Sequence, residues 1–281
     1  MKVNDVYLML QKRLSGVLES LRTKKTVKGY TDAEFLKAIN ELENIARDER
    51  FSELSFEVLG SSVFKDLAKE TRSIYELFEE FCETRLALSF IKGNTSLDSP
   101  QIMRTFEFAK EEGQAAGMDS NSRVIFIGSG PFPESALAYA QTFGCSVTCV
   151  DIHPEAVILG EEVALRSNLG ENIKFIHGDA RDVDYRFFTH IVVAVLAVPK
   201  KEILSRVAQT CQSGAIVICR NVRGFRALIY EPILDLPLDN FYLHDLIRGA
   251  PGTIVHSAVL RKITVDSMPV GRALDNVADG L

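Results

Sequence analysis

Two glycines that directly follow an apolar segment are the first residues of this chain whose spacing suits a binding site. Residues 124–127 are apolar, and the turn after them reads Gly128-Ser129-Gly130-Pro131. Glycine lets the backbone approach a ligand closely because it has no side chain. In a doubly wound sheet, a nucleotide-like group binds outside the carboxyl end of the first strand. Pro133 stands where a pyrophosphate-binding turn has its third glycine, so the turn favours an adenosyl group without phosphate, as in S-adenosylmethionine.

Two carboxylates at the ends of the next apolar segments could bind the rest of an adenosine. Asp151 comes about twenty residues after the turn, where one carboxylate can accept hydrogen bonds from both ribose hydroxyls. Asp151 could instead cap a helix that opens at Pro154. Asp179 follows the third segment, where an acid can accept from the adenine amino group while the amide of Ala180 meets a ring nitrogen. The alternative for Asp179 is an ordinary Gly-Asp turn.

The end of the fourth predicted strand argues against methylation of a base. Methyltransferases that act on the amines of bases or amides often carry an Asn-Pro-Pro-aromatic turn there, whereas residues 194–198 of this chain are apolar. The predicted cofactor-binding residues are Gly128, Ser129, Gly130, Pro131, Asp151, Ile152, Asp179, Ala180, Val195 and Leu196.

Three arginines crowd the loop beyond the fifth predicted strand, on the ligand side of the sheet. They are Arg220, Arg223 and Arg226. Arginine binds carboxylates through two parallel hydrogen bonds, so this loop could recognise amino-acid carboxylates. The alternative is the solvated start of a helix with scattered charge.

Glutamates in the helical region supply candidate bases. Glu76, Glu79 and Glu83 share one helix face at i, i+3, i+7 spacing. Most such residues are plain surface positions, but one of them could act as a base that faces the cofactor. The sequence contains no Ser-His-Asp order, metal-ligand spacing or phosphate-binding loop, and we expect no metal in the reaction.

Two regions of different character must position these residues. Residues 1–120 repeat apolar residues every three or four positions, which predicts a bundle of about five helices. Among them we expect a long helix over 63–90 and another that begins at Ser99-Pro100 with a capping hydroxyl. Residues 121–263 alternate strands and helices, which predicts a parallel sheet whose last strand is antiparallel near an edge. Residues 264–281 are predicted to be a surface tail.

The order of elements predicts the fold class. Strands are expected at 123–127, 146–150, 173–176, 190–196, 215–219 and 253–262. This pattern indicates an α/β chain with a Rossmann-like class I S-adenosylmethionine-dependent methyltransferase fold and an N-terminal α-helical bundle domain. The expected domains are therefore 1–120, helical, and 121–263, Rossmann-like, followed by the tail at 264–281.

Composition narrows the partners and the compartment. The 281 residues carry a net charge of −6, which provides no broad cationic surface for nucleic acid. The five cysteines are scattered, and we expect them to be buried and reduced. The N-terminus lacks the apolar core of a signal peptide, and the longest apolar run, 191–198, is too short to span a membrane. We expect a cytoplasmic protein with small-molecule partners, whose exposed helical faces would allow a homodimer.

Several of these segments together resemble nicotianamine synthases and the bacterial relatives that build opine-type metallophores of the staphylopine and pseudopaline type. The resemblance covers residues 95–263 and rests on the turn at 126–133, Asp151 with Pro154, Gly178-Asp179, residues 194–200, and Gly224-x-Arg226-Ala-x-x-Tyr230-x-Pro232. It implies transfer of the 3-amino-3-carboxypropyl (aminobutanoate) group of S-adenosylmethionine to an amine, with 5′-methylthioadenosine as the leaving group. S-adenosylmethionine is then a substrate, and the protein supplies orientation, a dry cleft and a base that keeps the amine neutral.

The helical region departs from the archaeal and plant members of that family. Those members carry a glutamate where this chain has Ala87, with Glu83 one turn earlier. They also carry a tyrosine in the next helix, where this chain has Glu111, Glu112 and Gly113. Both differences favour the bacterial subgroup, which transfers one aminobutanoate unit to the α-amine of histidine.

The resemblance also implies roles for the polar residues. Glu83 is expected to accept the amine proton, with Tyr230 and Arg226 in the catalytic group and Glu79, Arg220 and Arg223 as substrate-binding residues. Arg220, Arg226 and Tyr230 would hold amino-acid carboxylates. The acceptor stays open between L-histidine, D-histidine and S-adenosylmethionine itself, as in nicotianamine synthesis. Other open alternatives are a small-molecule methyltransferase, a non-catalytic helical interaction module and a nicotinamide-dependent oxidoreductase.

Overall fold

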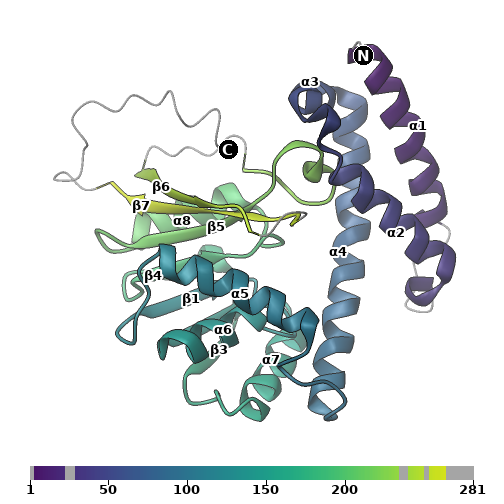
Figure 1. Ribbon diagram of the computed structural model, residues 1–281. Helices are drawn as coiled ribbons and strands as arrows, with labels where there is room; N and C mark the ends of the chain where they lie inside the picture. The colour runs from purple at the N-terminus through teal and green to yellow at the C-terminus, as the bar shows by residue number, and fades with distance from the viewer. Residues whose placement is uncertain (1–2, 23–28, 234–239, 250–252, 264–281) are drawn as a thin grey trace. The chain divides into compact units, whose positions relative to one another are not determined.

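The computed structural model describes residues 3–22, 29–233, 240–249 and 253–263 (Figure 1). The chain forms two compact units, one of Met1–Cys82 with Val222–Pro232 and the other of Glu83–Asn221 with Ile233–Leu281. The first unit is helical, and the second contains the sheet. The predicted tail at 264–281 lies outside the described residues.

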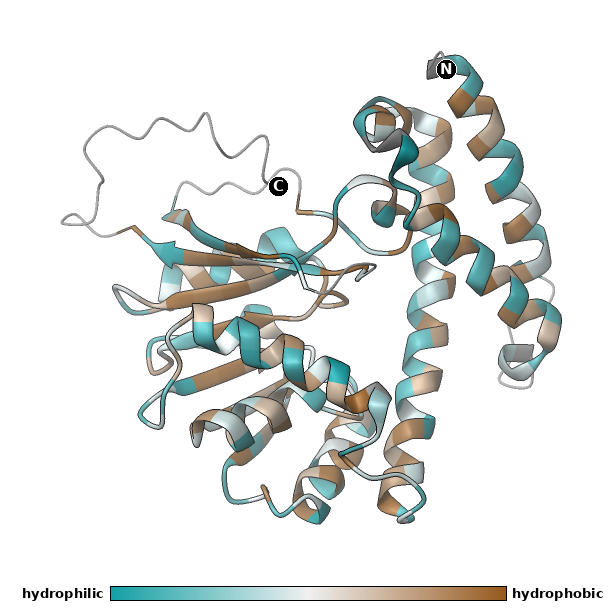
Figure 2. Ribbon diagram, in the orientation of Figure 1, coloured by the Kyte–Doolittle hydropathy of each residue, from teal (hydrophilic) through white to brown (hydrophobic). Residues whose placement is uncertain are grey.

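Amphipathic helices build the first unit. They are α1 (Val3–Arg22), α2 (Ala33–Ala46), α3 (Ser55–Gly60) and the first part of α4 (Ser62–Ile91), with the 3-10 turns η1 (Gly29–Thr31), η2 (Glu49–Leu54) and η4 (Gly224–Leu228). In α1 the side chains of Leu10, Leu14 and Leu21 are fully buried, and α1 contacts α2. Figure 2 shows apolar and polar residues alternating along these helices, as amphipathic packing requires. The predicted long helix over 63–90 is confirmed as α4.

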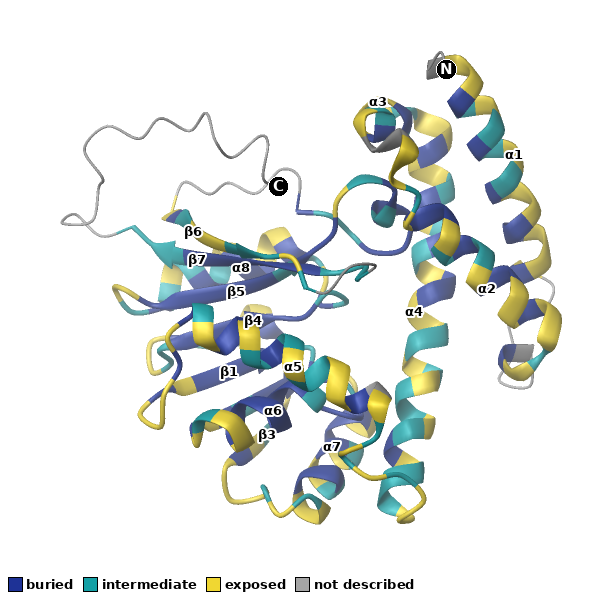
Figure 3. Cartoon of the chain, in the orientation of Figure 1, coloured by how far each residue is buried: buried dark blue, intermediate teal, exposed yellow. Residues whose placement is uncertain are grey.

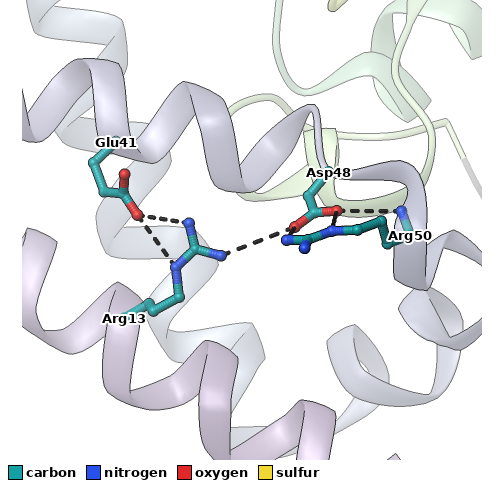
Figure 4. A network of polar contacts seen from close by, with 4 residues as sticks. All are labelled: Arg13, Glu41, Asp48 and Arg50. Carbon is teal, nitrogen blue, oxygen red and sulfur yellow. Dashed lines mark hydrogen bonds and ion pairs between the residues drawn. The ribbon is translucent and has the colours of Figure 1, made fainter. Parts of the chain in front are cut away.

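Polar contacts fix the start of α2 and the approach of α1 to it. The Asp32 carboxylate caps α2 by accepting from the amides of Glu34 and Phe35. Arg13 of α1 lies 2.6 Å from the Glu41 carboxylate and 3.9 Å from that of Asp48. Figure 4 shows the Asp48 carboxylate between Arg13 and Arg50, which donates to it from its guanidinium and its backbone amide. This network joins α1, α2 and the turn that follows α2.

A seven-stranded sheet forms the centre of the second unit, in the order β3-β2-β1-β4-β5-β7-β6. Its strands are β1 (Arg123–Ile127), β2 (Ser146–Asp151), β3 (Ile173–His177), β4 (His190–Val193), β5 (Ile216–Asn221), β6 (Phe241–Ile247) and β7 (His256–Lys262). The first five pair in parallel, and β7 pairs antiparallel to β5 and β6. This strand order confirms the predicted Rossmann-like class I methyltransferase fold.

The structure corrects two expectations about the sheet. Strand β6 was not expected; its residues are mostly half-buried or exposed, and His244 and Asp245 interrupt the apolar pattern. The final strand, β7, is antiparallel and lies next to the edge strand β6, so the prediction of an antiparallel strand near an edge is confirmed. The fourth strand was expected to reach residue 196 and ends at Val193, after which the backbone turns.

Four helices accompany the sheet: α5 (Pro100–Ala115), α6 (Glu134–Phe143), α7 (Pro154–Arg166) and α8 (Lys200–Thr210). α5 packs against α6 and also contacts β6 and β7, while α7 contacts β2 and β3. All of β4 is buried, which fits a strand covered on both faces, and Figure 3 shows the central strands in the buried colour. Ser99 holds the N-cap position of α5, but its side chain makes no capping hydrogen bond, contrary to the prediction.

The two units divide within α4, between Cys82 and Glu83. The sequence-based boundary at residue 120 instead marks the point where helices give way to strands, since β1 begins at Arg123. The last turns of α4 belong with the sheet because Leu86, Phe90 and Ile91 pack against its core.

Candidate active site

The turn after β1 has the close approach that its glycines predict. Gly128 and Gly130 both have positive φ, +74° and +66°, which favours glycine. A Cβ on Gly128 would lie 3.1 Å from the Cβ of Ala197 and 3.4 Å from that of Ala194. A Cβ on Gly130 would overlap the Glu83 carboxylate. A side chain at Gly128 would be tightly packed and one at Gly130 would displace the Glu83 carboxylate, so Glu83 of α4 lies directly against the turn.

Asp151 closes the turn from the tip of β2. Its carboxylate accepts from the backbone amide of Gly130 at 2.9 Å and from that of His153 at 3.0 Å. His153, not Asp151, holds the N-cap position of α7. Each carboxylate oxygen has capacity for more than one hydrogen bond, so Asp151 can hold the turn and still accept from ribose hydroxyls. Its neighbour Ile152 is exposed, and the Ile152 carbonyl lies 3.1 Å from the His177 ring.

Asp179 lies at the same edge of the sheet, one strand further out. β3 pairs with β2 so that His177 is opposite Asp151, and Gly178 donates to the Asp151 carbonyl at 2.9 Å. The Asp179 carboxylate caps the short η3 (Ala180–Asp182) and accepts from Arg181, whose guanidinium lowers the pKa of Asp179. The turn role that the sequence allowed is thus present, and adenine binding by Asp179 and Ala180 stays a prediction.

The segment after β4 packs on the glycine turn. Ala194 and Ala197 are the residues nearest to Gly128, and Val195 and Leu196 between them are half-buried. The ammonium of the buried Lys200 donates to the Val195 carbonyl, which holds this segment to the start of α8. Ser129 of the turn is also buried, as is Pro131. These contacts place the predicted residues Val195 and Leu196 beside the turn.

Arg220 is engaged by a carboxylate that belongs to the protein. Its guanidinium donates to both Glu112 oxygens, at 3.0 Å and 2.8 Å, and to the Ser135 hydroxyl at 2.7 Å. The Glu112 side chain is fully buried and also accepts from Tyr139 and Ser257. Burial alone would raise the pKa of Glu112, but Arg220 and these hydroxyls hold it below its usual value. Binding of a substrate carboxylate by Arg220 therefore stays a prediction, and a substrate carboxylate would have to replace Glu112 as the partner of Arg220.

The first unit carries a second group of predicted residues around Tyr230. The rings of Tyr230 and Tyr75 meet edge to face at 5.5 Å. Tyr75 donates from its hydroxyl to Glu43 at 2.8 Å. Burial raises the pKa of Glu79 to about 7; the nearby Tyr230 hydroxyl opposes this shift and the charge of Glu43 adds to it. A carboxyl group that titrates near neutral pH suits a proton acceptor.

Arg226 and Arg223 lie on or next to η4 in the same unit. Arg226 is largely buried and donates to the Glu49 carboxylate at 2.9 Å, but Glu49 itself is exposed. Arg223 is exposed. An exposed carboxylate partner is easily exchanged for a ligand because solvent already competes for the pair.

Three residues in these contacts were missed as functional candidates. Glu112 was noted only as a departure from the family, and Tyr75 and Glu43 were not considered. Glu112 occurs at a buried position of a helix, a pattern that favours an internal partner, but the identity of that partner depends on the tertiary structure.

A family model described as "Nicotianamine synthase protein" matches residues 102–266, more than half of the chain. The chain belongs to the nicotianamine synthase family. The match includes the glycine turn, Asp151, Asp179 and the arginine loop. It begins after Glu83 and therefore leaves out the helices of the first unit.

Curated relatives in this family have two kinds of name. The L-histidine 2-aminobutanoyltransferase of Pseudomonas aeruginosa strain PAO1 is 31% identical over 136 residues, 48% of this chain and 52% of the relative. The nicotianamine synthase of Solanum lycopersicum is 28% identical over 159 residues, 53% of this chain and 50% of the relative. The chain thus spans about half the length of the curated relatives it matches.

Among solved structures, a point mutant of MtNAS in complex with S-adenosylmethionine has a similar fold. Its TM-score is 0.76 at 22% identity, over 90% of this chain and 98% of that one. Since the similar fold covers 90% of this chain, it includes most of the helical region that the family model does not match.

Within the described ranges, no helix is long and apolar enough to cross a membrane. In the same part of the chain, no group of three or more His, Cys, Asp or Glu side chains is placed to hold a metal ion.

Proposed function

We propose that this protein transfers the 3-amino-3-carboxypropyl (aminobutanoate) group of S-adenosylmethionine to the α-amine of histidine and releases 5′-methylthioadenosine, as a step in the synthesis of an opine-type metallophore. The observation that carries the proposal is the glycine turn closed by Asp151, with the Glu83 carboxylate against it, in a member of the nicotianamine synthase family. The names of the bacterial relatives support histidine as the acceptor.

The turn fits an adenosyl substrate. Gly128 and Gly130 adopt positive φ and carry no side chain, so the backbone of the turn can approach a ligand, and Asp151 can accept from two ribose hydroxyls. We assign Gly128, Ser129, Gly130, Pro131, Asp151, Ile152, Asp179, Ala180, Val195 and Leu196 to binding of S-adenosylmethionine.

The chemistry that we propose needs a base more than an acid. The amine lone pair attacks the chain carbon bonded to sulfur, the carbon–sulfur bond breaks, and its electrons stay on sulfur in neutral methylthioadenosine. The amine must first lose a proton, because a protonated amine has no lone pair. We assign that proton to Glu83 and substrate binding to Glu79.

Substrate carboxylates are assigned first to Arg226 and Arg223, with Tyr230 beside them. Arg226 has an exposed and exchangeable partner in Glu49, whereas Arg220 would have to leave the buried Glu112. The proposal includes a cytoplasmic location, with neither nucleic acid nor a membrane as partner, and it allows a homodimer.

The by-product tests this function against its alternatives. The purified protein is incubated with S-adenosylmethionine and each enantiomer of histidine, and the products are separated by mass spectrometry. Methylthioadenosine that forms only with histidine supports the proposal, and methylthioadenosine without histidine indicates nicotianamine-type self-condensation. S-adenosylhomocysteine would identify a methyltransferase and overturn the proposal.

A further inference from the structure

The guanidinium of Arg226 uses only part of its hydrogen-bonding capacity. Its Nη2 donates to the Glu49 carboxylate at 2.9 Å. Its Nε is buried, and among the described residues no acceptor lies within hydrogen-bond reach of this atom. A buried donor without a partner has given up its hydrogen bond to water, and such groups are rare in folded proteins. Nε can therefore donate to one further acceptor.

Other arginines of the chain show how one carboxylate satisfies both nitrogens. In the first unit, Nε and Nη2 of Arg22 donate to the two oxygens of Glu70 at 2.7 Å and 2.6 Å. In the second unit, Arg220 binds Glu112 through the same two nitrogens. This side-on arrangement forms two parallel hydrogen bonds. The present partner of Arg226 forms only one of them.

The backbone that carries Arg226 is held in place. Arg226 lies in η4, and its carbonyl accepts from the amides of Ile229 at 2.9 Å and Tyr230 at 3.2 Å. The guanidinium of Arg72, on α4, donates to the carbonyl of the next residue, Ala227, at 2.8 Å. The side chain of Arg226 is only 11% exposed, so packing restricts its guanidinium as well.

Glu49 is the exchangeable partner of this pair. It stands at the start of η2, and its side chain is 66% exposed. The hydrogen bond and charge of Arg226 lower the pKa of Glu49, and the charge of Arg223 adds to this shift, so Glu49 is an anion at neutral pH. Water already competes with an exposed ion pair, so another carboxylate can replace Glu49 at little cost in free energy.

We propose that Glu49 is an internal competitor for the carboxylate site of Arg226, and that the α-amino-acid carboxylate of a substrate displaces Glu49 and binds side-on to Nε and Nη2. The inference rests on the proposed function for the identity of that substrate. Histidine and the aminocarboxypropyl chain of S-adenosylmethionine both carry such a carboxylate. The exchange replaces one hydrogen bond to Arg226 by two, and Glu49 lowers the affinity for the substrate that makes them.

Glu49→Gln tests the competition, with Glu53→Gln as the matched control. Glu53 is an exposed glutamate of the same turn, so each variant removes one negative charge from η2. Glutamine at position 49 keeps the size of the side chain but loses the charge that attracts the guanidinium. Because an exposed pair contributes little, we expect its removal to lower the Kd of the competing carboxylate about threefold to fivefold. Glu53→Gln should change that Kd much less.

The readout is the Nε–H resonance of Arg226 in protein labelled with 15N-arginine, assigned by its loss in Arg226→Lys. A donor proton that gains a charged acceptor moves downfield, so the resonance reports binding at Nε without any need for turnover. The protein is titrated separately with L-histidine and with S-adenosylmethionine at constant ionic strength. We expect a downfield shift that saturates with at least one of them, which identifies the source of the carboxylate.

The kinetic counterpart is the KM of the same substrate. It should fall about threefold to fivefold in Glu49→Gln while kcat changes little, because the competition affects binding and not the chemical step. A purely structural contact between Glu49 and Arg226 would leave this KM unchanged or raise it.

An Nε–H resonance that responds to neither substrate would overturn the inference. Equal Kd values in the wild-type protein and Glu49→Gln would also overturn it, even if methylthioadenosine forms with histidine as proposed. If the protein makes no methylthioadenosine, the proposed function fails, whereas the resonance and the Kd values still decide the role of Glu49.

Discussion

The backbone amide of Gly130 donates to the Asp151 carboxylate at 2.9 Å and so joins the turn after β1 to the tip of β2. The bond fixes a glycine with positive φ, where a side chain would be strained, and a carboxylate that can accept from a ribose. The two residues are 21 positions apart, and the parallel pairing of β1 with β2 brings them together.

Substitution of Gly130 should therefore weaken binding of S-adenosylmethionine. In Gly130→Ala the new Cβ would overlap the Glu83 carboxylate, and alanine at φ +66° costs about 1 kcal/mol. We expect the Kd of S-adenosylmethionine, measured by calorimetry, to rise about tenfold or more. Gly117→Ala is the control, because Gly117 has φ +69° with nothing within 4 Å. Equal affinities in the two variants would show that the turn is not the binding site.

Glu83→Gln should separate chemistry from binding. Glutamine keeps the size of the side chain against Gly130 but cannot accept the amine proton at neutral pH. We expect turnover to fall about a hundredfold, while the Kd of S-adenosylmethionine changes little. The control is Glu80→Gln, an exposed glutamate on the same helix. Unaltered turnover in Glu83→Gln would remove Glu83 from the mechanism.

The buried pair of Glu112 and Arg220 should matter more for stability when one partner is removed than when both are. Glu112→Gln leaves Arg220 uncompensated, and we expect the free energy of unfolding in urea to fall by about 3 kcal/mol. The double change Glu112→Met with Arg220→Met should recover much of that loss. Glu162→Gln, which breaks an exposed pair with Arg166, should cost less than about 1 kcal/mol. Equal losses in the buried and exposed pairs would contradict the burial of Glu112.

The raised pKa of Glu79 predicts how stability depends on pH. The pKa is about 7 in the folded protein against an ordinary 4.5, so between these values the folded state binds more protons than the unfolded state. The free energy of unfolding should fall as pH rises from 4.5 to 7 and level off above 7. Glu79→Gln should lose this part of the slope, as measured by urea unfolding at several pH values. Identical slopes in the two proteins would show that Glu79 titrates normally.

Local patterns were enough to predict most of the sheet and the glycine turn after β1. The apolar run of β4 and the glycines after β1 are signals within a few residues, and the structure has a strand and a turn at these places, although β4 ends at Val193. Strand β6 was missed because Phe241–Ile247 lies near solvent and carries polar residues. The partner of Arg220 could not be predicted, since Glu112 is 108 positions away. A buried arginine needs a hydrogen-bond partner, but any buried carboxylate could be that partner. Tyr75 and Glu43 are 32 positions apart, so the spacing of apolar residues along the helices could not predict their contact either.

The central claim is that the 3-amino-3-carboxypropyl group of S-adenosylmethionine, not its methyl group, is transferred to histidine. Two samples of S-adenosylmethionine, one labelled with 13C in the aminocarboxypropyl chain and the other in the methyl group, are each incubated with the protein and histidine. We predict that only the chain label appears in a histidine derivative, while the methyl label leaves in methylthioadenosine. A histidine product that carries the methyl label would contradict the account.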